Sequence, residues 1–270
     1  MIRKETSPRA LTLTGVTFSY PQTNETNALA GIDLKVPAGS YLGIVGSNGS
    51  GKTTLAFLIA GILKPVSGTI DTHGMRIGLV LSNPANQIVS LVVEEDIAFG
   101  PENMGLPSLE IKSRIGRALA DVHGEHLRYA LTSKLSGGQL AKVAYAGQLA
   151  MDVDILVLDE GTVMLDPASR KTLLKTIREL NTDLGKTVIH ISHRLEDLES
   201  ADEVLVLEDG AITHRSSGIF SLIKECADER ITGIEAGPHL LYRSFLKEHG
   251  IDDADIEKAT GMLADLIRKN

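Results

Sequence analysis

The chain has 270 residues, 43% of them hydrophobic, and its 35 acidic and 27 basic side chains give a net charge of −8. This size fits one main domain with a small appendage, and the acidic balance argues against a nucleic-acid surface as the main function. Cys226 is the single cysteine, which excludes an intrachain disulfide and a thiolate metal cluster and is typical of a reducing compartment. No signal-peptide core or apolar stretch of about 20 residues occurs, so we expect a soluble chain that could dock on a membrane protein.

Alternating apolar side chains predict several strands ahead of the first helix. One strand, with a bulge at Gly15, is expected over residues 11–20, a second over 31–36 and a third over 41–45. This β-rich opening differs from a plainly alternating α/β chain. Tyr20, at the end of the first strand, is either a packing residue or a ring that stacks on a nucleotide base.

Residues 46–54 read GSNGSGKTT and fit the pattern G-x-x-x-x-G-K-[ST] between the third strand and an apolar, helix-compatible run over 55–63. Glycines let backbone N–H groups turn toward a triphosphate without a Cβ in the way. Lys52 adds positive charge at the β- and γ-phosphates, and the Thr53 hydroxyl is placed to reach Mg²⁺. The loop therefore predicts binding of ATP or GTP.

Short strands and then helices are predicted after this loop. Strands are expected over residues 69–71 and 75–81, and a polar loop over 82–87 follows at a strand's C-terminal end, where α/β proteins gather their chemistry. Three acids that most simply form the solvated first turn of a helix are Glu94, Glu95 and Asp96. A further helix is predicted over 107–122, with its apolar face formed by Leu109, Ile111, Ile115, Leu119 and Val122.

His123 and His126 have the spacing H-x-x-H, which in principle could ligate a metal. Glu125 is the only nearby carboxylate at a matching helical spacing, so surface histidines are favoured over a metal site.

Residues 135–139 read LSGGQ and form the second stretch that carries chemistry. Ser136 is a good N-cap, and Gly137 and Gly138 leave the backbone bare at the start of a helix expected to run to Ala150. Such a helix N-terminus can bind an anion, although the same residues taken alone would be an ordinary cap.

Residues 154–160 read DILVLDE and predict a central parallel strand that is buried on both faces and ends in two acids. Asp159 is placed to hold Mg²⁺, and Glu160 to orient or deprotonate a water. A helix cap is the alternative for two adjacent acids, but no helix begins immediately after them.

The C-terminal half continues with helices and strands. Asp166 and a following proline predict the start of a helix that reaches residue 184, and a buried strand over 187–191 brings His193 to the same crevice as the paired acids. His190, inside that strand, is expected to be a packing residue. A D-G turn predicts a hairpin over 204–213, and polar-faced helices follow from residue 220.

Together these motifs resemble the ATPase subunit of ATP-binding cassette (ABC) transporters. The matches, in the family's order and spacing, are residues 46–53 (Walker A), 135–139 (signature), 155–160 (Walker B), Leu165-Asp166 (D-loop) and His193 (switch histidine). The resemblance covers roughly residues 10–215. It implies an α/β P-loop NTPase fold with a mixed β core sheet, an antiparallel β subdomain, a helical signature subdomain and a small C-terminal helical appendage.

A closer resemblance is to the ATPases of energy-coupling factor (ECF) importers, which take up vitamins and transition-metal ions. It is carried by residues 83–87, 93–100 and 102–103 and by the short helical C-terminal region. It implies a peripheral subunit at the cytoplasmic face of the cell membrane, with no nucleic-acid partner. The implied partners are a second ABC ATPase subunit, of the same or a different chain, a transmembrane scaffold protein and a substrate-binding membrane protein.

The resemblance also implies roles for residues. Tyr20 would stack on adenine, Thr53 and Asp159 would serve Mg²⁺, Glu160 would be the general base and His193 would contact the γ-phosphate. The implied nucleotide-binding residues are Tyr20, Gly46, Ser47, Asn48, Gly49, Ser50, Gly51, Lys52, Thr53, Thr54, Ser136, Gly137, Gly138, Gln139 and Asp166. The signature residues would act on the nucleotide of a second subunit, so that ATP joins two cassettes and hydrolysis releases them.

Three positions depart from the family's pattern. Ser82 stands where the Q-loop glutamine is usual and is too short to span the same distance, which leaves Gln87 as a substitute. Lys142 replaces an arginine, and residues 161–163 read GTV in place of a more common Ala/Pro-Thr run. The general base and the switch histidine are retained, which favours an active ATPase.

Two other functions stay open. Ser82 motivates a low-turnover regulatory cassette, and a soluble ABC ATPase outside transport is the second alternative. The sequence lacks the coiled-coil insertion of repair ATPases and the tandem cassette of translation ATPases, and the segment around Asn83 argues against iron–sulfur assembly. We expect a nucleotide-binding domain over residues 1–218, with its helical signature subdomain at about 83–150, and a small helical region over 219–270.

Overall fold

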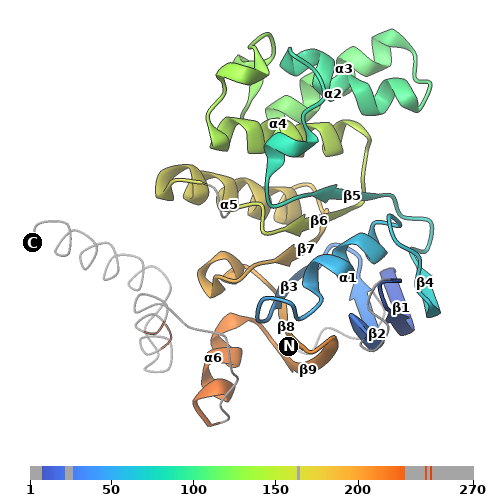
Figure 1. The fold of residues 1–270 in the computed structure, drawn as a ribbon. Helices are drawn as coiled ribbons and strands as arrows, with labels where there is room; N and C mark the ends of the chain where they lie inside the picture. Colours follow the sequence, from blue (N-terminus) through green and yellow to red (C-terminus); the bar gives the residue numbers. More distant parts are fainter. Residues whose placement is uncertain (1–7, 22–26, 163–164, 229–240, 242–243, 245–270) are drawn as a thin grey trace, which may run out of the picture.

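The computed structural model describes residues 8–21, 27–162, 165–228, 241 and 244. It contains a six-stranded sheet in the order β5-β6-β7-β3-β8-β9 and a three-stranded sheet in the order β2-β1-β4 (Figure 1). The strands are β1 (Arg9–Phe18), β2 (Leu29–Pro37), β3 (Tyr41–Val45), β4 (Ser67–Asp71), β5 (Ile77–Val80), β6 (Ile155–Asp159), β7 (Thr187–Ile191), β8 (Glu203–Glu208) and β9 (Ala211–Ser216). The helices are α1 (Lys52–Ile59), α2 (Val93–Asn103), α3 (Ser108–Asp121), α4 (Gly137–Ala150), α5 (Pro167–Thr182) and α6 (Ile219–Asp228), and the 3₁₀ turns are η1 (Pro84–Gln87), η2 (Glu125–Leu127), η3 (Thr132–Lys134) and η4 (Leu195–Leu198).

The six-stranded sheet is mixed, as the sequence predicts. Strands β5, β6, β7, β3 and β8 run parallel, and β9 pairs antiparallel with β8. The turn between β8 and β9 has positive φ at both Asp209 (46°) and Gly210 (77°), which is the geometry that a D-G hairpin favours. Because β3, β6 and β7 are parallel neighbours, the segments that follow them meet at one edge of the sheet.

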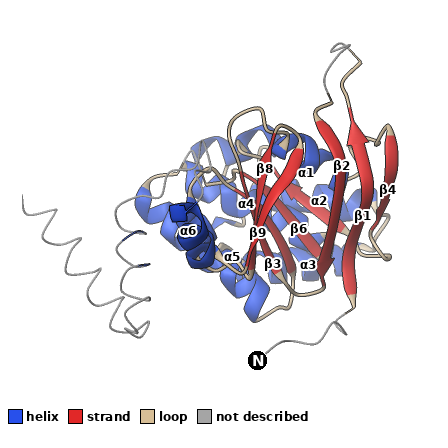
Figure 2. Cartoon of the chain, turned by 90° about the horizontal axis from the view of Figure 1, so that it is seen from below, coloured by secondary structure: helices blue, strands red, loops and turns tan. Residues whose placement is uncertain are grey.

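The second sheet is antiparallel, and α1 lies between it and the six-stranded sheet (Figures 1 and 2). The bulge expected in its central strand is present, because the β1–β2 register shifts between Leu13 and Val16. Gly15 there has φ 57° and donates its N–H to Asp33 Oδ1 at 2.9 Å. The strand predicted over residues 69–71 is present as β4 and forms an edge of this sheet.

Alternation along the buried strands divides the interior into two hydrophobic cores. On β3, Leu42 and Ile44 face the core shared with α1 and the antiparallel sheet. Tyr41 and Val45 face the opposite core, which is shared with α2, α3, α4 and α5. The parallel sheet is therefore covered on both faces, as its nearly continuous apolar strands predict.

The first turn of α2 corrects one expectation. Of its three acids, Glu94 pairs with Arg128 at 2.5 Å, and Asp96 Oδ1 accepts the N–H groups of Val89 (2.7 Å) and Ser90 (3.0 Å). The segment before α2 folds back over the helix start, so two of the acids serve as local partners and are not simply solvated.

The face predicted for α3 is also wrong at one position. Leu109 is 84% exposed, whereas Ile111, Ile115 and Leu119 are buried. Two residues along a helix rotate by about 200°, so a side chain at 109 points away from one at 111.

The expected C-terminal helical region begins as α6. Beyond it only residues 241 and 244 belong to the described part, so most of the region expected over 219–270, and with it the boundary at residue 218, stays a prediction. The side chain of Cys226 also lies outside the described residues. Within the described ranges, no helix is long and apolar enough to cross a membrane.

His190 on β7 is a packing residue, as expected, and it makes stability depend on pH. The side chain is fully buried and bonds the Tyr41 hydroxyl through Nδ1 at 2.8 Å. Burial lowers its pKa from 6.5 to about 4, an effect that the nearby Asp197 charge opposes and Arg170 reinforces. The unfolded chain therefore takes up a proton between these values while the folded chain does not.

We predict that the free energy of unfolding falls by about 3 kcal/mol from this residue as the pH drops from 6.5 to 4, at 1.36 kcal/mol for each pKa unit. Denaturant unfolding of the wild-type chain and of His190→Gln, which keeps an acceptor for Tyr41, measures the difference. The difference in free energy of unfolding between the two proteins should change over this pH range. A constant difference would contradict a lowered pKa of His190.

Candidate active site

The glycine loop joins β3 to α1 and closes around the side chain of Lys52. The Lys52 ammonium donates to the carbonyl oxygens of Gly46 (2.9 Å) and Ser47 (2.8 Å), and the side chain is almost fully buried. An ammonium has three protons, so one remains to face a ligand. Burial lowers the pKa of Lys52, and the carboxylates of Glu160 and Asp159 oppose that shift.

The loop needs glycine because neighbouring backbone approaches closely. A Cβ at Gly46 would lie 2.1 Å from the Leu207 carbonyl oxygen, and one at Gly51, where φ is 100°, would lie 2.5 Å from the Ala28 carbonyl oxygen. The loop is also tied to the β8–β9 turn, since Gly210 donates its N–H to the Ser50 carbonyl at 3.1 Å. The buried Ser50 hydroxyl has no hydrogen-bond partner within the described residues.

Thr53 and Asp159 meet across the crevice as the first turn of α1 and the end of β6. The Thr53 hydroxyl donates to Asp159 Oδ1 at 3.3 Å. Burial raises the pKa of Asp159, although the hydrogen bond from Thr53 and the charge of Lys52 act in the opposite direction. A nearby cation would favour the charged carboxylate in this position.

The Glu160 carboxylate and the His193 Nε2 atom are in direct contact between the segments that follow β6 and β7. Glu160 has φ 56°, a left-handed conformation that is uncommon outside glycine, and its N–H donates to the Ile191 carbonyl at 3.0 Å. The backbone of this acid is thus fixed by the neighbouring strand. Strained residues of this kind are often found at functional sites.

The loop, Glu160 and Tyr20 surround a common hollow of about 300 Å³. Its lining residues are Tyr20, Ala28, Asn48, Gly49, Gly51, Lys52, Thr53, Thr54 and Glu160. Tyr20 is 39% exposed, packs edge-on against Phe18 and shares a hydrogen bond of 3.1 Å with the Thr54 hydroxyl. The sequence did not single out Ala28, whose contribution depends on how β2 approaches the loop.

The predicted residues of the LSGGQ stretch and Asp166 do not line this hollow. Ser136 caps α4 in a capping box with Gln139, which confirms the predicted N-cap. Gly138 packs against the start of α5, where a Cβ would lie 2.8 Å from the Ser169 side chain. Asp166 Oδ1 caps α5 by accepting the N–H groups of Ala168 and Ser169, both at 3.0 Å.

Comparison with known proteins identifies this arrangement. The family model described as ABC transporter matches residues 29–163. The energy-coupling factor transporter ATP-binding protein EcfA of Methanosarcina acetivorans is 43% identical over 213 residues, which cover 74% of this chain and 77% of that protein. This chain belongs to the ABC transporter family. It is an ATP-binding cassette with ATPase activity, and the resemblance expected from its motifs is confirmed.

Further relatives and solved structures agree. EcfA1 of Symbiobacterium thermophilum is 43% identical over 217 residues, which cover 73% of this chain and 76% of that protein. The structure of cbiO1 from Clostridium perfringens, described as part of the ABC transporter complex cbiONQ, has a TM-score of 0.74 and 32% identity and covers 89% of this chain and 99% of that one. The cassette MJ0796 bound to ADP and phosphate has a TM-score of 0.67 and 25% identity, covering 77% and 98%.

Residues at or near the positions that depart from the family's pattern have structural roles. Gln87 does not substitute for the missing Q-loop glutamine. Its amide oxygen accepts the Leu81 N–H (2.8 Å) and its amide nitrogen donates to the Leu79 carbonyl (2.9 Å). Both atoms of the side-chain amide therefore bond the backbone at the C-terminal end of β5. Gly161 faces the buried Tyr145 hydroxyl, which lies 3.3 Å from where a Cβ would be. Val163, the last residue of that run, lies outside the described part.

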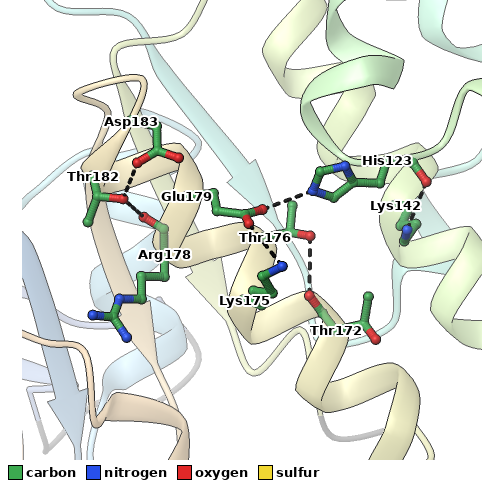
Figure 3. Close-up of polar contacts among 9 residues, drawn as sticks. All are labelled: His123, Lys142, Thr172, Lys175, Thr176, Arg178, Glu179, Thr182 and Asp183. Atoms are coloured by element: carbon green, nitrogen blue, oxygen red, sulfur yellow. Dashed lines mark hydrogen bonds and ion pairs between the residues drawn. The ribbon is translucent and has the colours of Figure 1, made fainter. Parts of the chain in front are cut away.

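Lys142 and His123 make ordinary polar contacts (Figure 3). Lys142 donates to the His123 carbonyl at 2.9 Å, and His123 Nε2 bonds Glu179 of α5 at 2.9 Å. The first contact lies within the helical part of the cassette, and the second joins that part to α5. His126 is exposed, and no cluster of three metal-binding side chains occurs among the residues that the structure describes.

We predict that Gly51→Ala weakens ATP binding at least tenfold, because the new methyl group would collide with the Ala28 carbonyl and push the loop open. Gly61→Ala is the matched control, since Gly61 also has positive φ (72°) but open space around it. Both changes strain the backbone by about 1–3 kcal/mol, and only the first deforms the loop. Equal ATP affinity in the two variants, measured by calorimetry, would contradict this reading.

Proposed function

We propose that this cassette is the ATP-hydrolysing subunit of an energy-coupling factor importer, working through ATP-driven pairing of two cassettes. The observation that carries the proposal is the meeting of Lys52, Asp159, Glu160 and His193 at one edge of the parallel sheet. The relatives named EcfA and the neighbour cbiO1 support the transport assignment. The nucleotide is the substrate, and the residues below are assigned to it.

The phosphates would be bound by the loop and the adenine by Tyr20. Lys52 and the N–H groups around Gly49 and Gly51 present positive charge at the start of α1. Tyr20 lies at the rim of the hollow with part of its ring exposed, which suits stacking on a base.

Thr53 and Asp159 fit a Mg²⁺ ion. Their hydroxyl and carboxylate oxygens are the hard ligands that this ion prefers, and they already lie 3.3 Å apart. When bound, the ion supplies charge that offsets the negative charge of the β- and γ-phosphates.

Glu160 is proposed as the general base, with His193 as its neighbour toward the γ-phosphate. The Glu160 carboxylate lines the hollow and is oriented by His193 and by its own fixed backbone. It would accept a proton from the attacking water, and the loop would hold the phosphate in line.

The second half of the site is proposed to come from another cassette. Ser136, Gly137, Gly138 and Gln139 cap α4 outside the hollow, although a bare helix N-terminus suits a phosphate. A partner's signature, with Asp166 beside the shared surface, would complete each site. ATP would then favour the paired state by its differential affinity, and hydrolysis would release it.

A groove between α2 and α3 is proposed as the contact with the membrane scaffold. It has a volume of about 520 Å³ and its lining includes Glu94, Glu95, Phe99, Glu102 and Lys112. Phe99 is 50% exposed, and carboxylates outnumber the single lysine. Such a surface suits a helix with apolar and basic side chains, which would place the cassette at the cytoplasmic face of the membrane.

The transported substrate would be a vitamin or a transition-metal ion. A separate membrane protein would bind it, because the hollow of this cassette suits a nucleotide. A low-turnover regulatory cassette is the second candidate. Ser82 favours it, since Gln87 is committed to β5 and does not restore the missing side chain.

Glu160→Gln is predicted to lower the steady-state rate of ATP turnover by the assembled complex at least 100-fold, while ATP still binds. The amide cannot accept a proton but keeps the shape of the side chain. Glu203→Gln, a change at the opposite end of the sheet where the acid pairs with Arg215, should leave turnover within twofold. Lack of turnover in the wild-type complex would support the regulatory alternative.

Charge reversal in the groove should release the cassette from the membrane. Glu95→Lys combined with Glu102→Lys is expected to lower the fraction that sediments with host membranes at least fivefold, without changing ATP affinity. Glu125→Lys is the control, because that acid is exposed in the same helical region but outside the groove. Equal sedimentation of the two proteins would exclude this surface as the contact.

A further inference from the structure

A buried polar cluster lies beneath the candidate active site and is centred on Asp197 of η4. Its carboxylate has no exposed surface. Oδ2 accepts hydrogen bonds from the Thr162 hydroxyl (2.6 Å) and the Ser192 hydroxyl (3.0 Å), and Oδ1 accepts one from Arg170 Nε (2.6 Å). Arg170 Nη2 also contacts Oδ1, so the guanidinium binds through two nitrogens. An ionised side chain this deep in the protein is stable only with such partners.

The three partners come from the segment of Glu160, the segment of His193 and the start of α5. Thr162 lies two residues after Glu160, and Ser192 lies directly before His193. Arg170 lies on the first turns of α5, where its N–H bonds the carbonyl of the capping residue Asp166 at 2.9 Å. The carboxylate itself does not line the hollow.

We propose that Asp197 is a positioning residue for ATP hydrolysis: it fixes the spacing between the Glu160 and His193 segments and joins both to the start of α5. This inference rests on the proposed function, because it assigns a role relative to the general base. The backbone bond from Glu160 to Ile191 joins the first two segments, and the Asp197 carboxylate adds side-chain bonds to both of them and to α5, so it acts as an anchor that all three share. A displacement of about 1 Å at a reacting group is enough to lower a rate by up to 100-fold.

The same geometry predicts which kinetic constant changes. None of the four residues contacts the glycine loop through a hydrogen bond, and ATP affinity depends on that loop. Loss of the anchor should therefore lower kcat and leave KM for ATP nearly unchanged. General loosening of the fold would change both constants.

The test uses the full-length chain in the complex purified from its host's membranes. Asp197→Asn, which keeps the shape but loses the charge and places an NH₂ group against a donor, is expected to lower kcat at least tenfold with KM within twofold. Thr162→Val and Ser192→Ala each remove one donor and keep the pair with Arg170, so losses of two- to fivefold are expected. These two variants carry the test if Asp197→Asn does not fold.

Asp202→Asn is the control, because that carboxylate holds the Tyr41 N–H (2.9 Å) at the opposite end of β3 and should leave kcat within twofold. An unchanged kcat in Thr162→Val and Ser192→Ala would overturn the inference, and so would a proportional change in kcat and KM. Glu160→Gln in the same assay separates the two claims. If the wild-type complex turns over ATP and only Glu160→Gln abolishes it, the proposed function holds and this inference fails; if the wild-type complex has no turnover, both fail.

Discussion

The structure depends on how one buried ammonium is held at the edge of a parallel sheet. Lys52 is anchored by two carbonyl groups of its own loop, and the loop is in turn fixed by the β8–β9 turn and by the close approach of Ala28. Charge buried in this way needs compensation, and the carboxylates at the end of β6 supply part of it. A triphosphate would supply the rest. The sheet order β6-β7-β3 then brings the side chains that follow β6 and β7 to the edge where the glycine loop lies.

The parallel arrangement explains why residues more than 100 positions apart form one site. β3, β6 and β7 are neighbours, so the loop, the paired acids and His193 emerge at one edge. α1 and the antiparallel sheet cover one face, while α2 to α5 cover the other. The signature helix belongs to that second group, and residues 136–139 at its start do not line the hollow. In the proposed function each complete site combines the hollow of one cassette with the signature of another, which is why pairing is proposed as the switch.

Much of this could be predicted from the sequence, because glycine loops, capping residues and apolar strands obey local rules. The bulge at Gly15, the Ser136 cap and the parallel strand ending in Asp159 are determined by neighbouring residues. Leu109 was wrong for a local reason, the geometry of its helix, whereas the other differences have a tertiary origin. The sequence cannot show that Gln87 folds back on β5, that Arg128 reaches Glu94, or that β4 joins the antiparallel sheet. Asp197 gave no signal either, since its partners come from separate segments and only the fold brings them together.

The most direct test of the account is to tag this chain in its own host, solubilise the membranes gently and identify by mass spectrometry what co-purifies. The account predicts a multi-span scaffold protein, a small substrate-binding membrane protein and a second cassette, either another copy or a different chain. Recovery of soluble partners alone, or of none, would contradict the importer assignment and leave a nucleotide-switched cassette with another task.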